Sequence, residues 1–127
     1  VMKTPIKTRY LKVINYQVPD GTFAISGFRV FGSGIGEKPT KVRTFNISRT
    51  KSDSRSAILS WTKLKNAIGY NIRFGIQPDK LYRSYQVFDS TSIAINSLNK
   101  GQRYWFAIDA FGENGVTPGV TEEAIIP

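Results

Sequence analysis

The side chains that could perform acid–base chemistry in this chain are limited to nine carboxylates. The sequence has neither histidine nor cysteine, which removes the commonest general base, thiol nucleophiles and the usual metal ligands. Hydrolysis by carboxylates needs two of them about 5 to 10 Å apart across a cleft. The acids nearest in sequence, Asp109 with Glu113 and Glu122 with Glu123, lie on or beside predicted strands rather than in a cleft. We therefore expect no catalytic residue, no metal site and no cofactor.

Candidates for binding remain among the aromatic and charged side chains. The stretch "RYWFAIDAFGENG", residues 103–115, alternates so that Trp105 and Asp109 lie on the outward face of a predicted strand. Arg73 takes an outward position on an earlier predicted strand, and Tyr82 begins another. Three interpretations of Trp105 stay open: an Arg73 pair with Trp105 or Asp109 across strands, docking against a neighbouring domain, and a stacking platform for a sugar. These four residues are the ligand or interface candidates.

The positive charge is unevenly placed along the chain. Of the net charge of +9, residues 1–65 hold 13 basic against 3 acidic side chains, whereas residues 66–127 hold 5 against 6. Such an excess favours polyanionic partners. The basic residues are nevertheless scattered singly, as in "KTRYLK" and "SRTKSDSR", which is typical of solvated strand faces and loops. We expect no nucleic-acid partner, and an acidic polymer remains an alternative.

The dominant period of the sequence is two, as expected of strands buried on one face. Runs at 9–16 and 23–32, joined by a Pro-Asp-Gly turn, predict an N-terminal β-hairpin. The following "GSGIGEKPT", residues 32–40, has the composition of a linker or an ordered loop, and we place a linker at 36–40. No run approaches the roughly 18 apolar residues of a membrane span.

Seven further strand-like runs follow the linker within about 85 residues, each ended by a short turn. This spacing predicts an antiparallel sandwich. The runs occupy residues 42–49, 56–64, 69–76, 82–88, 92–98, 103–111 and 121–126.

Four residues within these runs resemble the pattern of a fibronectin type III domain over residues 41–126. They are Trp61 in "AILSWTKL", Tyr70 in "AIGYNIRF", and Leu98 followed six residues later by Tyr104. The resemblance implies a seven-stranded immunoglobulin-like sandwich with Trp61, Tyr70 and Tyr104 pointing inward. It also implies that the Tyr104 hydroxyl bonds back to the backbone.

The N-terminal stretch "TRYLKVINYQVPDGTFAISGFRVFGSGIG" resembles the last strands of a discoidin-like, galactose-binding jelly roll. Two strands cannot make that fold, which needs about eight. The resemblance therefore implies that residues 1–35 are a hairpin left from a larger domain. Residues 41–127 then form the fibronectin type III-like domain. An unpaired edge on the hairpin makes a dimer through it a further alternative.

Taken together, the two halves resemble the C-terminal region of bacterial xylosidase or arabinosidase-like glycoside hydrolases, family 43 relatives in particular. "GYNIRFGIQPDKLYRSYQVFD", beginning at residue 69, is the most particular part of this match. The resemblance implies a non-catalytic accessory domain of an exported enzyme, in the periplasm or at the cell surface. It spaces or braces neighbouring domains of the same parent chain; the alternative is a module that binds xylan, arabinan or a polyanion.

Overall fold

The computed structural model describes residues 4, 6–25, 27, 30, 32 and 34–126. The chain divides into two units, Val1–Ser33 and Gly34–Pro127. Each unit is described by itself.

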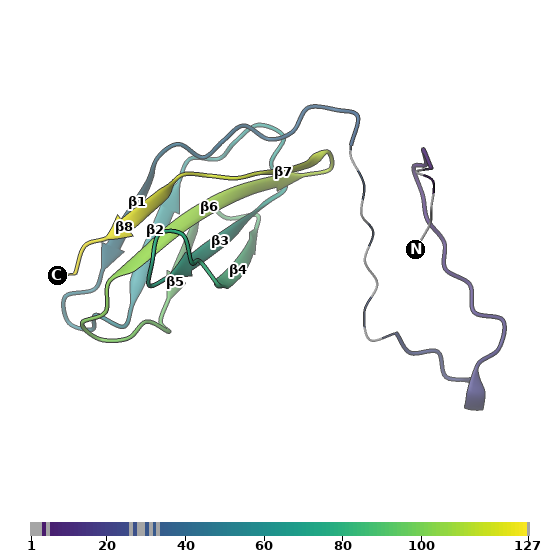
Figure 1. Ribbon diagram of the computed structural model, residues 1–127, viewed down its shortest axis with the longest axis horizontal. Coiled ribbons are helices and arrows are strands. Elements are labelled where there is room, and N and C mark those ends of the chain that lie inside the picture. Colours follow the sequence, from purple (N-terminus) through teal and green to yellow (C-terminus); the bar gives the residue numbers. More distant parts are fainter. Residues whose placement is uncertain are drawn as a thin grey trace. The chain divides into compact units, whose positions relative to one another are not determined.

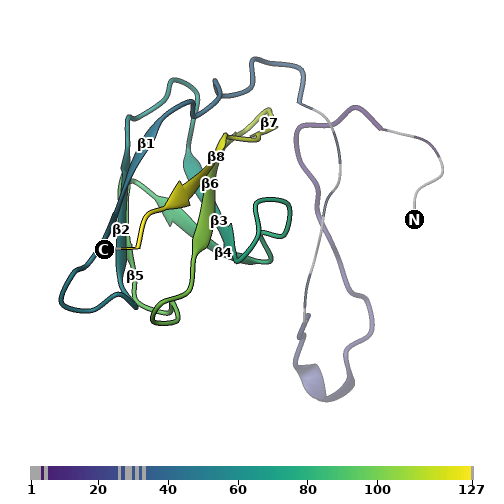
Figure 2. The same cartoon turned by 60° about the vertical axis from the view of Figure 1, so that its left-hand side comes forward.

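The second unit is built from two antiparallel sheets that face each other (Figures 1 and 2). In the three-stranded sheet, β2 (Ala57–Trp61) lies between β1 (Phe45–Arg49) and β5 (Ser92–Ile95). In the five-stranded sheet, β3 (Gly69–Gly75) lies between β4 (Arg83–Phe88) and β6 (Tyr104–Gly112), and both β7 (Gly115–Thr117) and β8 (Thr121–Ala124) pair with β6. The predicted all-β, immunoglobulin-like sandwich is confirmed.

A short additional strand, β7, precedes the last predicted strand, so that eight strands stand where seven were expected. Both β7 and β8 run along β6, and Pro118 and Gly119 lie between them. Proline has no N–H to donate to the ladder. A side chain at Gly119 would place its Cβ only 2.0 Å from the Ile108 carbonyl oxygen, so glycine allows the segment between β7 and β8 to lie close against the backbone of β6.

The core between the sheets contains the aromatic residues that the sequence predicted. Trp61 and Tyr70 are both nearly buried, and their rings meet edge to face at 5.1 Å. The Tyr104 hydroxyl accepts a hydrogen bond from the Asn99 N–H at 3.1 Å. The Tyr70 hydroxyl accepts one from the Leu64 N–H at 2.9 Å. The inward orientation of the three rings and the backbone bond of Tyr104 are confirmed.

The described part of the first unit contains no strand, which corrects the predicted first strand of the hairpin, residues 9–16. The reversal at Pro-Asp-Gly is present as a 3-10 turn, η1 (Pro19–Gly21), with Asp20 at φ 56°. Apolar side chains before the turn stay exposed, Tyr10 at 82%. A two-stranded ribbon without a covering layer is marginal in water. The second predicted strand, 23–32, includes residues 26, 28, 29 and 31, which lie outside the described residues. No helix of the described residues is long and apolar enough to cross a bilayer.

Candidate functional site

Two of the four candidate residues meet on the outer face of the five-stranded sheet. The Arg73 guanidinium donates two hydrogen bonds to the Asp109 carboxylate, from Nε to Oδ2 at 2.5 Å and from Nη2 to Oδ1 at 3.0 Å. The Gly119 N–H also donates to Oδ1, at 3.0 Å. The hydrogen bonds to Asp109 raise the pKa of Arg73, although its partial burial opposes the shift. The ion pair and the Gly119 bond therefore link β3, β6 and the turn before β8.

Asp109 is buried, with 6% of its surface exposed, although the sequence predicted it on an open face. The alternation is right, since Asp109 lies opposite Asn71 on the outer side. The covering comes from Arg73 and from the backbone around Gly119. Neither was predictable from the period of the strand, because both approach Asp109 from other parts of the chain.

Trp105 lies outside the core cluster and is partly buried. It stands opposite Gly75 on one side and Glu123 on the other. The cation over its ring is Arg103, whose guanidinium carbon lies 5.4 Å from the ring centroid, and Arg103 also forms an ion pair with Glu123. Of the two partners considered for Arg73, Asp109 is the one it pairs with.

Tyr82 lies in the turn before β4 and is 84% exposed. Within the described residues, no hydrogen bond or ring contact joins it to Trp105, Arg73 or Asp109. The four candidates therefore include one ion pair and two separate rings, and the structure does not gather them into a single site.

A bound segment, residues 34–40, lies along the end of the sandwich where the chain enters it. We call this segment the strap. The Asn114 side chain holds it from the tip of the β6–β7 hairpin: Oδ1 accepts from the Gly36 N–H at 3.1 Å, and Nδ2 donates to the Glu37 carbonyl at 3.2 Å. The sequence left this glycine-rich stretch as a linker or an ordered loop. In the structure it is an ordered, hydrogen-bonded segment.

The glycines of the strap allow its close approach to the hairpin. A Cβ at Gly34 would lie 2.4 Å from an Asn114 atom, and one at Gly36 would lie 2.5 Å from another. Farther along, Pro39 is buried and its carbonyl accepts from the Thr117 hydroxyl at 2.7 Å. The glycine-rich composition of this stretch, which is typical of a linker, therefore permits close packing against Asn114.

A depression of about 460 Å³ lies beside the strap. Its two acids, Glu37 and Glu113, are exposed, so water competes with any use of them as paired acid and base. No group of three or more acidic side chains in the described part of the chain could hold a metal ion. The lining residues are Glu37, Asn66, Ala67, Ile68, Glu113 and Asn114.

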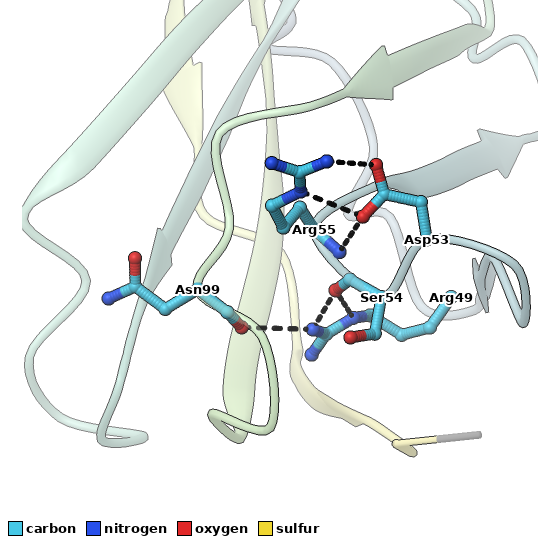
Figure 3. Close-up of polar contacts among 5 residues, drawn as sticks. All are labelled: Arg49, Asp53, Ser54, Arg55 and Asn99. Atoms are coloured by element: carbon cyan, nitrogen blue, oxygen red, sulfur yellow. Dashed lines mark hydrogen bonds and ion pairs between the residues drawn. The ribbon is translucent and has the colours of Figure 1, made fainter.

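A buried arginine at the opposite end of the sandwich was missed by the sequence reasoning. Arg49 is 6% exposed and donates only to backbone carbonyls: Nη1 to Gln102 at 2.9 Å, Nη2 to Asn99 at 3.3 Å, and Nε to Ser54 at 3.0 Å. Its guanidinium carbon also lies 5.6 Å from the centroid of the Tyr104 ring. Figure 3 shows Arg49 between the two turns that it joins. No local signal distinguishes it from the other basic residues of its run.

Comparison with known proteins places the sandwich by its fold. No protein-family model matches the chain, and no curated protein matches it. An Fn3-like protein from Clostridium thermocellum is 17% identical with a TM-score of 0.61, covering 72% of this chain and 93% of that one. An FN3 domain of human collagen XX is 19% identical with a TM-score of 0.56, covering 76% and 98%.

Chicken CNTN1 FN1–FN3 domains are 26% identical to this chain, with a TM-score of 0.56 over 68% of this chain and 29% of that one. The structural neighbours are thus fibronectin type III domains of bacterial and animal proteins. The second unit has the fibronectin type III fold.

Proposed function

We propose that this chain is a non-catalytic accessory region of an exported glycoside hydrolase of the xylosidase or arabinosidase type, and that the sandwich spaces and braces the neighbouring domains of that enzyme. The fibronectin type III fold supports an accessory role. The sequence likeness that begins at residue 69 supports the kind of parent enzyme. Export to the periplasm or cell surface belongs to the same proposal.

The observation that carries the bracing role is the bound strap. A domain that only separates its neighbours needs a free linker, whereas one that fixes their direction needs the connecting chain held against its body. Asn114 bonds to the strap at two successive residues, and Pro39 is buried beyond them. The path of the chain over residues 34–40 is therefore fixed to the sandwich.

The bracing role is tested by releasing the strap. Asn114→Ala should lower the backbone amide order parameters of residues 34–40 while the sandwich stays folded. Asn99→Ala, an exposed asparagine in another turn, is the matched control. In the parent enzyme, X-ray scattering should show a wider distribution of sizes for Asn114→Ala only. An unchanged strap, or hydrolysis of an aryl xyloside by the chain itself, would overturn the proposal.

A second candidate function, binding of a xylan or arabinan chain, is favoured by Trp105. Its partly buried ring has the Arg103 guanidinium over it, and Arg103 is paired with Glu123, so an apolar ring stands next to polar groups that could bond to sugar hydroxyls. Affinity electrophoresis in gels containing arabinoxylan tests this. Retardation that survives high salt and disappears in Trp105→Ala would support a sugar site, and equal mobility of both proteins would exclude it.

A further inference from the structure

Two turns that are far apart in sequence form one surface at the end of the sandwich opposite the strap. The β1–β2 turn and the turn before β6 lie side by side there (Figures 1 and 2). Together, residues 49–56 and 99–103 hold five basic side chains and one acidic one. We call these two stretches the basic end. Arg49 joins them through its bonds to Ser54 and Asn99.

The charge of Arg49 is not cancelled by its partners. Its nitrogens donate to carbonyl oxygens, which are neutral and satisfy the hydrogen bonds without removing the net charge. A charge with little water around it is screened less than one in bulk solvent. Arg49 therefore adds a positive potential beneath the exposed side chains of the basic end.

The single acid of the basic end is already engaged. Asp53 accepts two side-chain bonds from Arg55, from Nε at 2.9 Å and from Nη2 at 3.0 Å (Figure 3). The Arg55 bonds are the main cause that lowers the pKa of Asp53, and the charge of Lys100 adds a smaller effect. Glu123 on β8 likewise pairs with Arg103, so, within the described part of the chain, the side chains of the basic end without a carboxylate partner are Arg49, Lys51 and Lys100.

We propose that the basic end binds an anionic polysaccharide through its carboxylates. Exposed Lys51 and Lys100 provide the charge, because the Arg55 guanidinium is already paired with Asp53. Hydroxyls and amides alternate with them and are suited to sugar hydroxyls; these come from Thr50, Ser52, Ser54, Ser56, Asn99 and Gln102. Neither stretch contains an aromatic residue, and the neighbouring Trp105 ring has the Arg103 guanidinium over it, so the basic end has no row of rings on which successive bases could stack.

This inference stands apart from the proposed function, because a brace and a binding surface are located at different ends of the sandwich. It also revises the expectation from the sequence, which assigned any polyanion binding to the basic first half. The basic end draws Lys100 and Arg103 from the second half. The surface exists only because the fold brings the two turns together.

The test uses residues 1–127 and polygalacturonate as the probe, with affinity measured by calorimetry at low and high salt. The double variant Lys51→Gln with Lys100→Gln should bind about tenfold more weakly, as expected when two exposed ion pairs are lost. The control, Lys63→Gln with Lys65→Gln, removes the same charge from the turn at the strap end. It should stay within about twofold of the original protein, because only its net charge differs.

Four results would overturn the inference. Equal weakening by both double variants would mean that net charge alone attracts the polymer. Absence of binding to polygalacturonate at low salt, or equal binding of neutral xylan, would exclude a carboxylate-binding surface. Tighter binding of a single-stranded oligonucleotide of equal charge would assign the basic end to nucleic acid instead. Each of these leaves the strap test, and hence the bracing role, untouched.

Discussion

Replacing Arg49 with methionine tests whether a buried cation bonded to carbonyls holds the two turns of the basic end together. Methionine keeps the unbranched stem and much of the volume while removing the guanidinium. Carbonyls of Ser54, Asn99 and Gln102 would each lose a donor. The contact with the Tyr104 ring would become apolar.

The expected loss can be worked from these contacts. A hydrogen bond to a charged donor contributes about 1.5 to 3 kcal/mol, and the three bonded carbonyls set an upper limit several times larger. The gain from no longer burying a charge offsets part of it. Some of the carbonyls also become reachable by water once the turns separate. We expect Arg49→Met to lower the free energy of unfolding by about 2 to 4 kcal/mol.

Urea unfolding followed by circular dichroism measures this difference. Arg55→Met is the matched control, because it removes a guanidinium from an exposed pair in the same turn; it should change the midpoint little. The free energy of unfolding of Arg49→Lys should lie between those of Arg49→Met and Arg55→Met, since one ammonium cannot reach both turns as the planar guanidinium does. If Arg49→Met were no less stable than Arg55→Met, the two turns would not depend on the buried cation.

Three further changes have expected outcomes. Asn114→Ala should leave the unfolding midpoint nearly unchanged while the Gly36 amide loses order, measured by amide relaxation. Asp109→Asn should lower the free energy of unfolding in urea by about 1 to 3 kcal/mol, because Arg73, which is partly buried, loses its charged partner. The pKa of Asp53 is lowered in the folded chain, so any stability that Asp53→Asn forfeits should be present at neutral pH and disappear as the pH falls through that lowered pKa; midpoints across an acid series check this.

The part of the fold that the sequence predicted well has a local and repeated signal. Alternation predicted the strands, and the resemblance to a fibronectin type III domain implied the inward faces of Trp61, Tyr70 and Tyr104 and the backbone bond of the last ring. These features depend on the period of a strand and on a motif within one segment. Such information is present in the sequence before any long-range contact is known.

The features that the sequence did not predict all depend on contacts between distant segments. Asp109 has an outward position, yet Arg73 and Gly119 cover it. Gly36 suggested a flexible linker, yet it packs against Asn114, where a side chain would be too close. Arg49 is one basic residue in a polar run, and only the approach of the second turn buries it. Strand period states which face a side chain takes, but not what lies on that face.

The two ends of the sandwich can act independently because the strands between them are long. β6 runs from the basic end to the hairpin that holds the strap, and its nine residues span about 30 Å at roughly 3.3 Å each. This distance exceeds the screening length of about 8 Å at physiological salt. Polygalacturonate bound at the basic end should therefore leave the amide relaxation of residues 34–40 unchanged. A change there would mean that the sandwich transmits binding to the strap, and would join the two roles into one.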